Sequence, residues 1–177
     1  MKTLSIKPLN SFQIIVLGFA GVILAGALLL MLPVSSATHC VTPFLNALFT
    51  STTSVCVTGL IVVDTGTYWS VFGQAVILVL IQIGGMGVVT VAAAVTIISG
   101  RKIGLMQRST MQEAVAAPKM SGIVRLTGFI IRATLLIELS GAALLAPVFC
   151  RDFGPIRGLW MAVFHSISAF CNAGIDL

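Results

Sequence analysis

The segment FLNALFTSTTSVCVTGL at residues 44–60 returns in altered form as LWMAVFHSISAFCNAGI at residues 159–175. Upstream of each copy, LMLPV at 30–34 matches LLAPV at 144–148 with a shift of 114 positions. These matches predict a repeated unit made of a span, a short helix, a glycine turn and a returning span, of which the second copy stops after its glycine turn. A shift of 115 positions pairs identical residues of the two segments: Ala47 with Ala162, Phe49 with Phe164, Ser51 with Ser166, Cys56 with Cys171, and Gly59 with Gly174.

The composition indicates a membrane protein. Of the 177 residues, 58% are hydrophobic and only 8% are charged, and the mean hydropathy is +1.11. A soluble domain of this size needs more polar groups to cover its surface. The net charge of +5 does not indicate nucleic-acid binding, because the basic residues lie between apolar segments and not in a patch interleaved with aromatic residues.

Three apolar segments are long enough to cross a bilayer, which takes about 20 helical residues. They are residues 12–32, a stretch within 69–98 and a stretch within 126–149. The first segment has 21 residues without a charge, which is too long for the apolar region of a secretory signal peptide. We therefore expect all three to be retained membrane helices.

The distribution of lysine and arginine predicts the orientation of these spans. The N-terminal tail carries Lys2 and Lys7, the segment 99–125 carries five basic residues, and the segment 34–68 carries none. Because cytoplasmic loops are enriched in lysine and arginine, the N-terminus and segment 99–125 are expected inside and segment 34–68 outside. Residues 103–117 are expected to form a helix at the cytoplasmic surface.

The outer segment 43–57 is too short to span the membrane and too apolar for a solvated loop. A short helix that enters the membrane and returns fits this pattern, with Pro43 in its first turn. Repeated glycine turns after such helices can present rings of backbone carbonyls to a dehydrated cation. The predicted fold is thus an all-α membrane protein with re-entrant selectivity-filter loops. Its expected parts are a first span–pore helix–span repeat (1–98), a cytoplasmic amphipathic linker (99–121) and an incomplete second repeat (122–177).

The sequence offers no set of catalytic or metal-binding residues. It contains no HExxH motif, no P-loop, no Ser–His–Asp order and no paired carboxylates, so we do not expect an enzyme. The sequence has no CxxC pair, so nothing in it suggests a zinc or redox site. Cys40 and Cys150 both follow apolar runs on the expected outer side, and are either joined by a disulfide or unrelated.

Several ionisable residues allow both a structural and a functional interpretation. Glu138 lies within the third span, where a charge is costly. We expect it to bond to the back of a short helix, with an ion relay as the alternative. His165 is expected to be packed and hydrogen-bonded, with a pH sensor as the alternative. Asp64 and Asp176 follow the glycine turns, and either attract cations to the outer mouth or cap local backbone.

Two local patterns are expected to be structural. The hydroxyl side chains at 50–54 are expected to bond to carbonyls four residues earlier in their own helix, whereas Thr58 lies in the glycine turn itself. The GGxG pattern at 84–87 lacks the strand–turn–helix setting of a nucleotide loop. Close helix packing or a bend is the expected role of its glycines.

The motifs TSTTSVCVTGLIVVDTGTYW at 50–69, ILVLIQIGGMGVVT at 77–90 and FHSISAFCNAGIDL at 164–177 resemble the Trk/Ktr/HKT superfamily of potassium transporters, most closely its Ktr-type membrane subunit. The resemblance extends from Ser11 onward. It implies four span–pore helix–span repeats, of which this chain would hold the first and about half of the second. It also implies that the filter carbonyls bind potassium: those of Val57, Thr58, Gly59, Leu60, Asn172, Ala173, Gly174 and Ile175.

The same resemblance implies partners. These are a second copy of the full-length subunit, a cytoplasmic ring of nucleotide-binding regulatory subunits and membrane lipid, with no nucleic acid. The transported ion would be potassium, with sodium as a candidate activator and no other cofactor or metal. Arg101, Lys102 and Arg108 would either touch the ring or serve only as topology charges beside anionic lipid.

We therefore expect potassium uptake across the plasma (inner) membrane, with the N-terminus cytoplasmic. One alternative is a secondary transporter that carries another small cation through broken helices, which would require ionisable groups near the turns. The other alternative is a non-conducting fragment.

Overall fold

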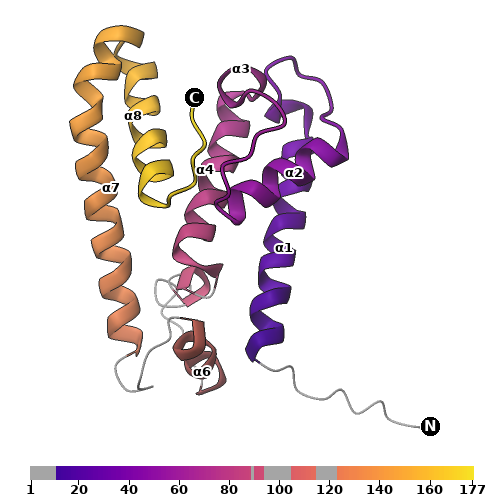
Figure 1. Cartoon of the computed structure of the whole chain (residues 1–177), viewed down its shortest axis with the longest axis vertical. Coiled ribbons are helices and arrows are strands. Elements are labelled where there is room, and N and C mark those ends of the chain that lie inside the picture. Colours follow the sequence, from indigo (N-terminus) through magenta and orange to yellow (C-terminus); the bar gives the residue numbers. More distant parts are fainter. Residues whose placement is uncertain (1–10, 89, 94–104, 115–122) are drawn as a thin grey trace.

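The computed structural model of the chain describes residues 11–88, 90–93, 105–114 and 123–177 (Figure 1). This part contains no β-strand, only an isolated bridge between Ser36 and Trp69, so the prediction of an all-α protein is confirmed. Its elements in chain order are α1 (Ser11–Met31), the 3-10 helix η1 (Pro33–Ser35), α2 (Phe44–Val55), α3 (Thr65–Tyr68), α4 (Val71–Met86), α6 (Leu105–Ala114), α7 (Ile123–Phe153) and α8 (Pro155–Phe170).

Two helices of the described part are long and apolar enough to cross a membrane, Gln13–Met31 in α1 and Val124–Phe153 in α7. They correspond to the first and third predicted spans. The second predicted span begins as α4, which is apolar but has only 16 residues. It ends at Gly87, whose φ of +81° interrupts the helix, and residues 94–98 of that prediction lie outside the described residues.

The short helix predicted after the first span is α2. Pro43 does not lie in its first turn but directly before it, where the Pro43 carbonyl accepts a hydrogen bond of 3.0 Å from the Ala47 N–H. The counterpart in the second half of the chain is α8, which begins at Pro155. Each short helix packs against the long helix that precedes it, α2 against α1 and α8 against α7 (Figure 1).

The repeat seen in the sequence has a structural counterpart in matched hydrogen bonds. The Ser51 hydroxyl of α2 donates to the Ile23 carbonyl of α1 at 2.7 Å, across 28 positions of the chain. The Ser166 hydroxyl of α8 donates to the Glu138 carbonyl of α7 at 2.6 Å, also across 28 positions. All four residues obey the shift of 115, so each short helix is attached to its span at the same point.

The shift of 114 that aligns LMLPV with LLAPV is not a structural match. Pro33 begins η1 after α1 has ended at Met31, whereas Pro147 lies inside α7, which continues to Phe153. A proline removes one backbone donor, and membrane helices tolerate that loss. The second long helix is therefore extended past the point where the first one stops.

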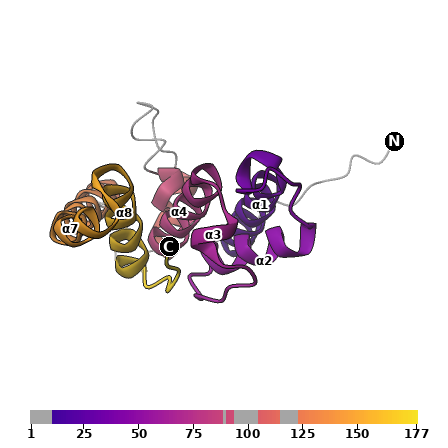
Figure 2. The same cartoon turned by 90° about the horizontal axis from the view of Figure 1, so that it is seen from above.

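Helix α4 lies between α1 and α8 (Figure 2) and contacts both short helices. A methyl group on Gly84 would collide with the Val55 carbonyl at the end of α2, and one on Gly85 would collide with the Cys171 sulfur just after α8. Of the two roles expected for this glycine pattern, close packing or a bend, the close packing is confirmed. The surrounding core is formed by buried side chains that include Leu30, Trp69, Ile77, Ile81 and Phe164.

Helix α6 covers part of the surface helix predicted over residues 103–117. It lies near the N-terminal end of α1 (Figure 1), and the side chain of Met111 is buried there. Its placement at a cytoplasmic membrane surface stays a prediction.

The packing of α4 gives a test of the fold. We expect Gly84→Ala to lower the stability of the purified protein by about 1–3 kcal/mol, because the added methyl meets backbone that has to move. Gly21→Ala is the matched control, since a methyl at Gly21 meets no atom within 4 Å. Thermal unfolding followed by circular dichroism measures both. Equal melting temperatures for the two variants would contradict the close approach of α4 to α2.

Candidate functional site

The two glycine turns, residues 57–60 and 172–175, share an unusual backbone conformation. In the first turn φ is +49° at Val57 and +73° at Gly59, and in the second it is +56° at Asn172 and +66° at Gly174. Positive φ is rare for a residue with a side chain, and for a β-branched residue such as valine it is strained. Such strain persists only where surrounding interactions impose it. Both turns therefore have the same backbone conformation, with positive φ at their first and third residues.

A hydroxyl residue in the last turn of each short helix holds its glycine turn. The Leu60 N–H donates to the Thr53 hydroxyl oxygen at 2.9 Å, and the Thr58 N–H donates to the Thr53 carbonyl at 3.0 Å. In the second repeat, Ser168 takes the place of Thr53. Its hydroxyl oxygen accepts from the Ile175 N–H at 3.2 Å, and its carbonyl accepts from the Ala173 N–H at 2.8 Å. We call Thr53 and Ser168 the hydroxyl braces.

These bonds use the N–H groups of the turns and leave most of their carbonyls free. Within the described residues, no hydrogen bond uses the carbonyl oxygens of residues 57–60 or 172–174. The carbonyl of Ile175 differs, because it accepts a bond of 2.5 Å from the Ser168 hydroxyl. Seven of the eight carbonyls named from the sequence thus have no partner within this part of the chain.

The two turns lie directly against each other. A Cβ atom placed on Gly59 would be 2.8 Å from the Ala173 carbonyl oxygen and 3.3 Å from the Gly174 Cα. A Cβ placed on Gly174 would be 3.5 Å from the Gly59 Cα. The structure therefore brings together both predicted filter segments, with their matched glycines as neighbours.

The hydroxyl-rich stretch 50–54 serves two purposes. Thr52 donates to the Leu48 carbonyl at 2.7 Å and Ser54 to the Thr50 carbonyl at 2.6 Å, as predicted. The prediction was wrong for Ser51 and Thr53, which reach α1 and the glycine turn. The repeat distinguishes the hydroxyls that bond within their own helix from those that bond to other segments. At a shift of 115, Ser51 falls on a serine and Thr53 also falls on a serine, whereas Thr52 falls on an isoleucine and Ser54 on an alanine.

Glu138 does not make the contact that was expected from the sequence, a side-chain bond to the back of a short helix. Its side chain does not bond to a short helix but accepts a hydrogen bond of 2.8 Å from the Gln82 side chain of α4. Only its backbone carbonyl receives the Ser166 hydroxyl of α8. Glu138 is 4% exposed, and the second polar atom of the Gln82 amide has no partner among the described residues. The pair therefore joins α4 of the first repeat to α7 of the second.

Two other ionisable residues have local structural partners. His165 shares a hydrogen bond of 2.8 Å with the Met161 carbonyl and stacks on Phe149 with ring centroids 5.0 Å apart, which agrees with the packed interpretation. Asp64 caps α3 by accepting from the Thr67 hydroxyl at 2.6 Å and from the Thr67 N–H at 2.8 Å. These bonds hold the pKa of Asp64 below its usual value. A role of Asp176 at the outer mouth stays a prediction.

Other candidates from the sequence take no part in this site. The thiols of Cys40, Cys56, Cys150 and Cys171 are all free. The described residues contain no group of three or more His, Cys, Asp or Glu side chains that could hold a metal ion. Arg101 and Lys102 lie outside these residues, as does the side chain of Arg108.

Long apolar helices, each followed by a short helix and a facing glycine turn, define an all-α membrane protein built of repeats. The chain belongs to the cation transport protein family TrkH, whose family model matches residues 4–177.

Curated relatives agree with this family. The chain is 40% identical to the potassium/sodium uptake protein NtpJ of Enterococcus hirae, over 97% of the chain and 38% of that protein. It is 44% identical to the Ktr system potassium uptake protein B of Bacillus subtilis, over 93% of the chain and 37% of that protein. The protein of the same name from Vibrio alginolyticus is 38% identical. The chain spans less than two fifths of the length of these relatives.

The pair of Gln82 and Glu138 gives a test of how the repeats are joined. Gln82→Leu should lower stability by about 1–3 kcal/mol, because it leaves a buried acid without its donor. Glu138→Leu should have a similar cost, since the amide then loses its acceptor. The double variant should recover most of the loss, because two apolar side chains leave neither group unpaired. Thermal melts of the four proteins measure this, and simple addition of the two losses would rule the pairing out.

Proposed function

We propose that the chain forms part of a pathway for potassium uptake across the plasma membrane. Its contribution is a pair of filter segments made of the eight turn residues named above, with Ile175 also bonded to its brace. The observation that carries the proposal is the pair of facing turns with matched positive φ angles and free carbonyl oxygens. The potassium uptake proteins of Bacillus subtilis and Vibrio alginolyticus, to which the chain is similar, support the choice of ion.

The proposed filter replaces the water around the ion. A potassium ion that enters a narrow path gives up its hydration shell, and rings of backbone carbonyls can take the place of that water. Bonds to the hydroxyl braces fix the N–H groups of both turns on the side of the short helices. Helices α2 and α8 each end directly before a glycine turn, and the dipole at a helix C-terminus favours a cation. Two turns do not close a ring, so further repeats have to come from a longer chain or from other subunits.

We also propose the arrangement of the whole protein. Residues 1–98 form the first span–pore helix–span repeat with α2 as a re-entrant pore helix, residues 99–121 form a cytoplasmic linker, and residues 122–177 begin the second repeat. The N-terminus is cytoplasmic, and α3 lies outside. The membrane potential drives potassium inward, with sodium as a candidate activator. A second full-length subunit and a cytoplasmic ring of nucleotide-binding subunits are the proposed partners, in keeping with the named Ktr systems of the relatives.

The alternative of a secondary transporter with ionisable ligands has less support. Of the acidic residues near the turns, Asp64 is engaged in capping α3 and Glu138 is bonded to Gln82, whereas the exposed Asp176 has no partner among the described residues. By contrast, seven of the eight turn carbonyls have no hydrogen-bond partner among the described residues. The alternative of a non-conducting fragment is decided by comparing the chain alone with a completed protein.

The test is growth of a bacterial strain without potassium uptake on low potassium. The 177-residue chain is expressed alone and also completed with the remaining C-terminal part of the Bacillus subtilis relative. We expect rescue by the completed protein, and a loss of uptake on the order of tenfold or more with Gly59→Ser. The reason is that a serine at a φ of +73° is strained and its Cβ meets the Ala173 carbonyl.

Gly21→Ser is the control, because this position has open space around it. Rescue by the completed protein but not by the chain alone would identify the chain as an incomplete pore. If the completed protein is expressed normally and Gly59→Ser supports the same uptake and the same preference for potassium over sodium, the filter assignment is wrong.

A further inference from the structure

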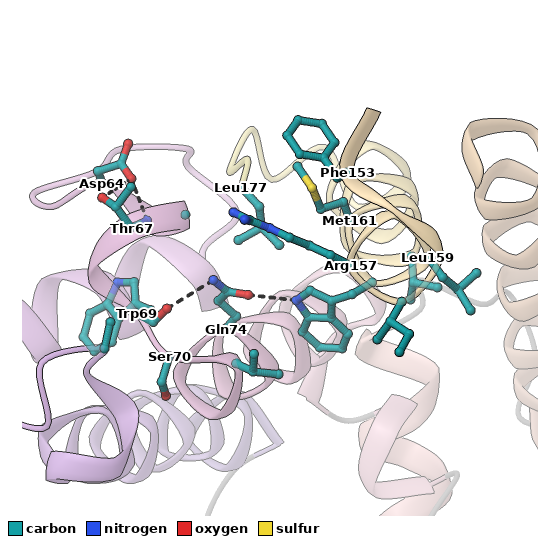
Figure 3. Close-up of a pocket in the computed structure, with 16 residues that line it drawn as sticks. Asp64, Thr67, Trp69, Ser70, Gln74, Phe153, Arg157, Leu159, Met161 and Leu177 are labelled. Atoms are coloured by element: carbon teal, nitrogen blue, oxygen red, sulfur yellow. Dashed lines mark hydrogen bonds between the residues drawn. The ribbon is translucent and has the colours of Figure 1, made fainter. Parts of the chain in front are cut away.

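A cavity of about 1090 Å³ lies between the first turns of α4 and α8 (Figure 3). It lies at the junction of the two repeats, since α3 and α4 belong to the first repeat and α8 belongs to the second. A cavity of this size holds a small molecule or a large part of a lipid. Its walls are mostly apolar and include Val71, Phe153, Ile156, Leu159, Trp160 and Val163.

Most polar groups at the base of the cavity are satisfied by internal hydrogen bonds, and the Trp69 indole N–H is the exception, with no partner among the described residues. The Trp160 indole N–H donates to the Gln74 side-chain oxygen at 2.8 Å, and the Gln74 amide donates to the Trp69 carbonyl at 3.1 Å (Figure 3). The Ser70 hydroxyl donates to the Val34 carbonyl. These groups position α4 against α8 and have little capacity left for a ligand.

Two opposite charges that also line the cavity are not paired with each other. Arg157 projects from α8, with its guanidinium carbon 5.8 Å from the centre of the Phe153 ring, and it forms no ion pair within the described chain. Asp64 lies on the α3 side of the cavity. Only one of its carboxylate oxygens accepts hydrogen bonds, both from Thr67, and these bonds cap α3. In Figure 3 the Arg157 side chain extends from α8 toward Leu177 and the α3 side. The cavity therefore presents a cation on one wall and an anion on the other.

Large apolar side chains at the cavity entrance face outward. Ile156 is 88% exposed, Val71 is 67% exposed and Leu159 is 54% exposed. In a membrane protein such side chains meet acyl chains, whereas the partly exposed Trp160 ring suits the boundary between headgroups and acyl chains. The cavity thus combines two charged groups with exposed apolar side chains, as a phospholipid combines a charged headgroup with acyl chains.

We propose that this cavity binds a phosphatidylethanolamine molecule of the outer leaflet. Its phosphate lies on Arg157, since a guanidinium binds phosphate through charge-assisted hydrogen bonds. Its ammonium lies toward Asp64, and its acyl chains cover Ile156, Leu159 and Val71. The second charge favours a zwitterionic headgroup, because Asp64 would repel an anionic lipid and a choline headgroup has no N–H donors for a carboxylate. The assignment to the outer leaflet depends on the orientation given under the proposed function. The lipid site itself does not depend on ion conduction.

The experiment is native mass spectrometry of the protein after exchange into mixed micelles. These contain equal amounts of phosphatidylethanolamine, phosphatidylglycerol and phosphatidylcholine. The 177-residue chain and the completed protein are both measured. We expect a retained phosphatidylethanolamine in both, a loss of about tenfold or more with Arg157→Gln, and partial retention with Arg157→Lys. Asp64→Asn should remove the preference over phosphatidylglycerol while keeping α3 capped, because asparagine is also a good N-cap.

Arg151→Gln is the matched control, since Arg151 is an arginine of the nearby α7 end that does not line the cavity. It should leave lipid retention unchanged, and circular dichroism checks that all variants fold. The proposal is overturned if Arg157→Gln retains as much phosphatidylethanolamine as Arg151→Gln, or if phosphatidylglycerol is preferred by the unchanged protein. Retention by the chain but not by the completed protein would also overturn it, because later residues would then fill the cavity. Lipid retention is measured without transport, so its failure and the failure of the potassium proposal are separate results.

Discussion

The hydrogen bond from a turn N–H to a hydroxyl brace is the interaction on which the rest of the site depends. Thr53 and Ser168 each accept from the fourth residue of their glycine turn, while their carbonyls accept from the second residue. Without these partners the N–H groups of the buried residues Ala173 and Ile175 would be unpaired inside the protein, which is costly. Positive φ at Val57 and Asn172 would then be held only by the bonds of their own N–H groups to the carbonyls of Ser54 and Ala169. The braces thereby determine which backbone groups are left to face the neighbouring repeat.

The two repeats have the same attachment points but are not identical, and the differences lie where they meet. Helix α4 reaches both short helices because Gly84 and Gly85 have no side chains to keep α2 and α8 away. At the position of Ile23 in the first repeat, the second repeat has Glu138, whose side chain bonds back to α4 through Gln82. The residues that repeat thus form the equivalent turns, whereas residues that differ between the repeats, such as Glu138, connect one repeat to the other.

Much of this arrangement could be predicted from the sequence, because the repeat is a local pattern. The spans, the short helices and the glycines of both turns follow from hydropathy and from the shift of 115. The targets of side-chain hydrogen bonds could not be predicted in the same way, because they depend on which helices meet. Gln82 and Glu138 are 56 positions apart, and no spacing rule brings such residues together. The hydroxyl braces could have been predicted from the sequence, since Thr53 and Ser168 both carry hydroxyls at matched positions of the repeat.

In the proposed pathway, carbonyls of both glycine turns bind the transported ion. The most direct measurement is anomalous diffraction from crystals of the completed protein soaked in rubidium, which substitutes for potassium and scatters anomalously. We expect a rubidium peak between the two turns, within coordination distance of the carbonyls of Gly59 and Gly174. A peak beside the carboxylate of Glu138 or Asp64, with none between the turns, would contradict it and favour a transporter with ionisable ligands.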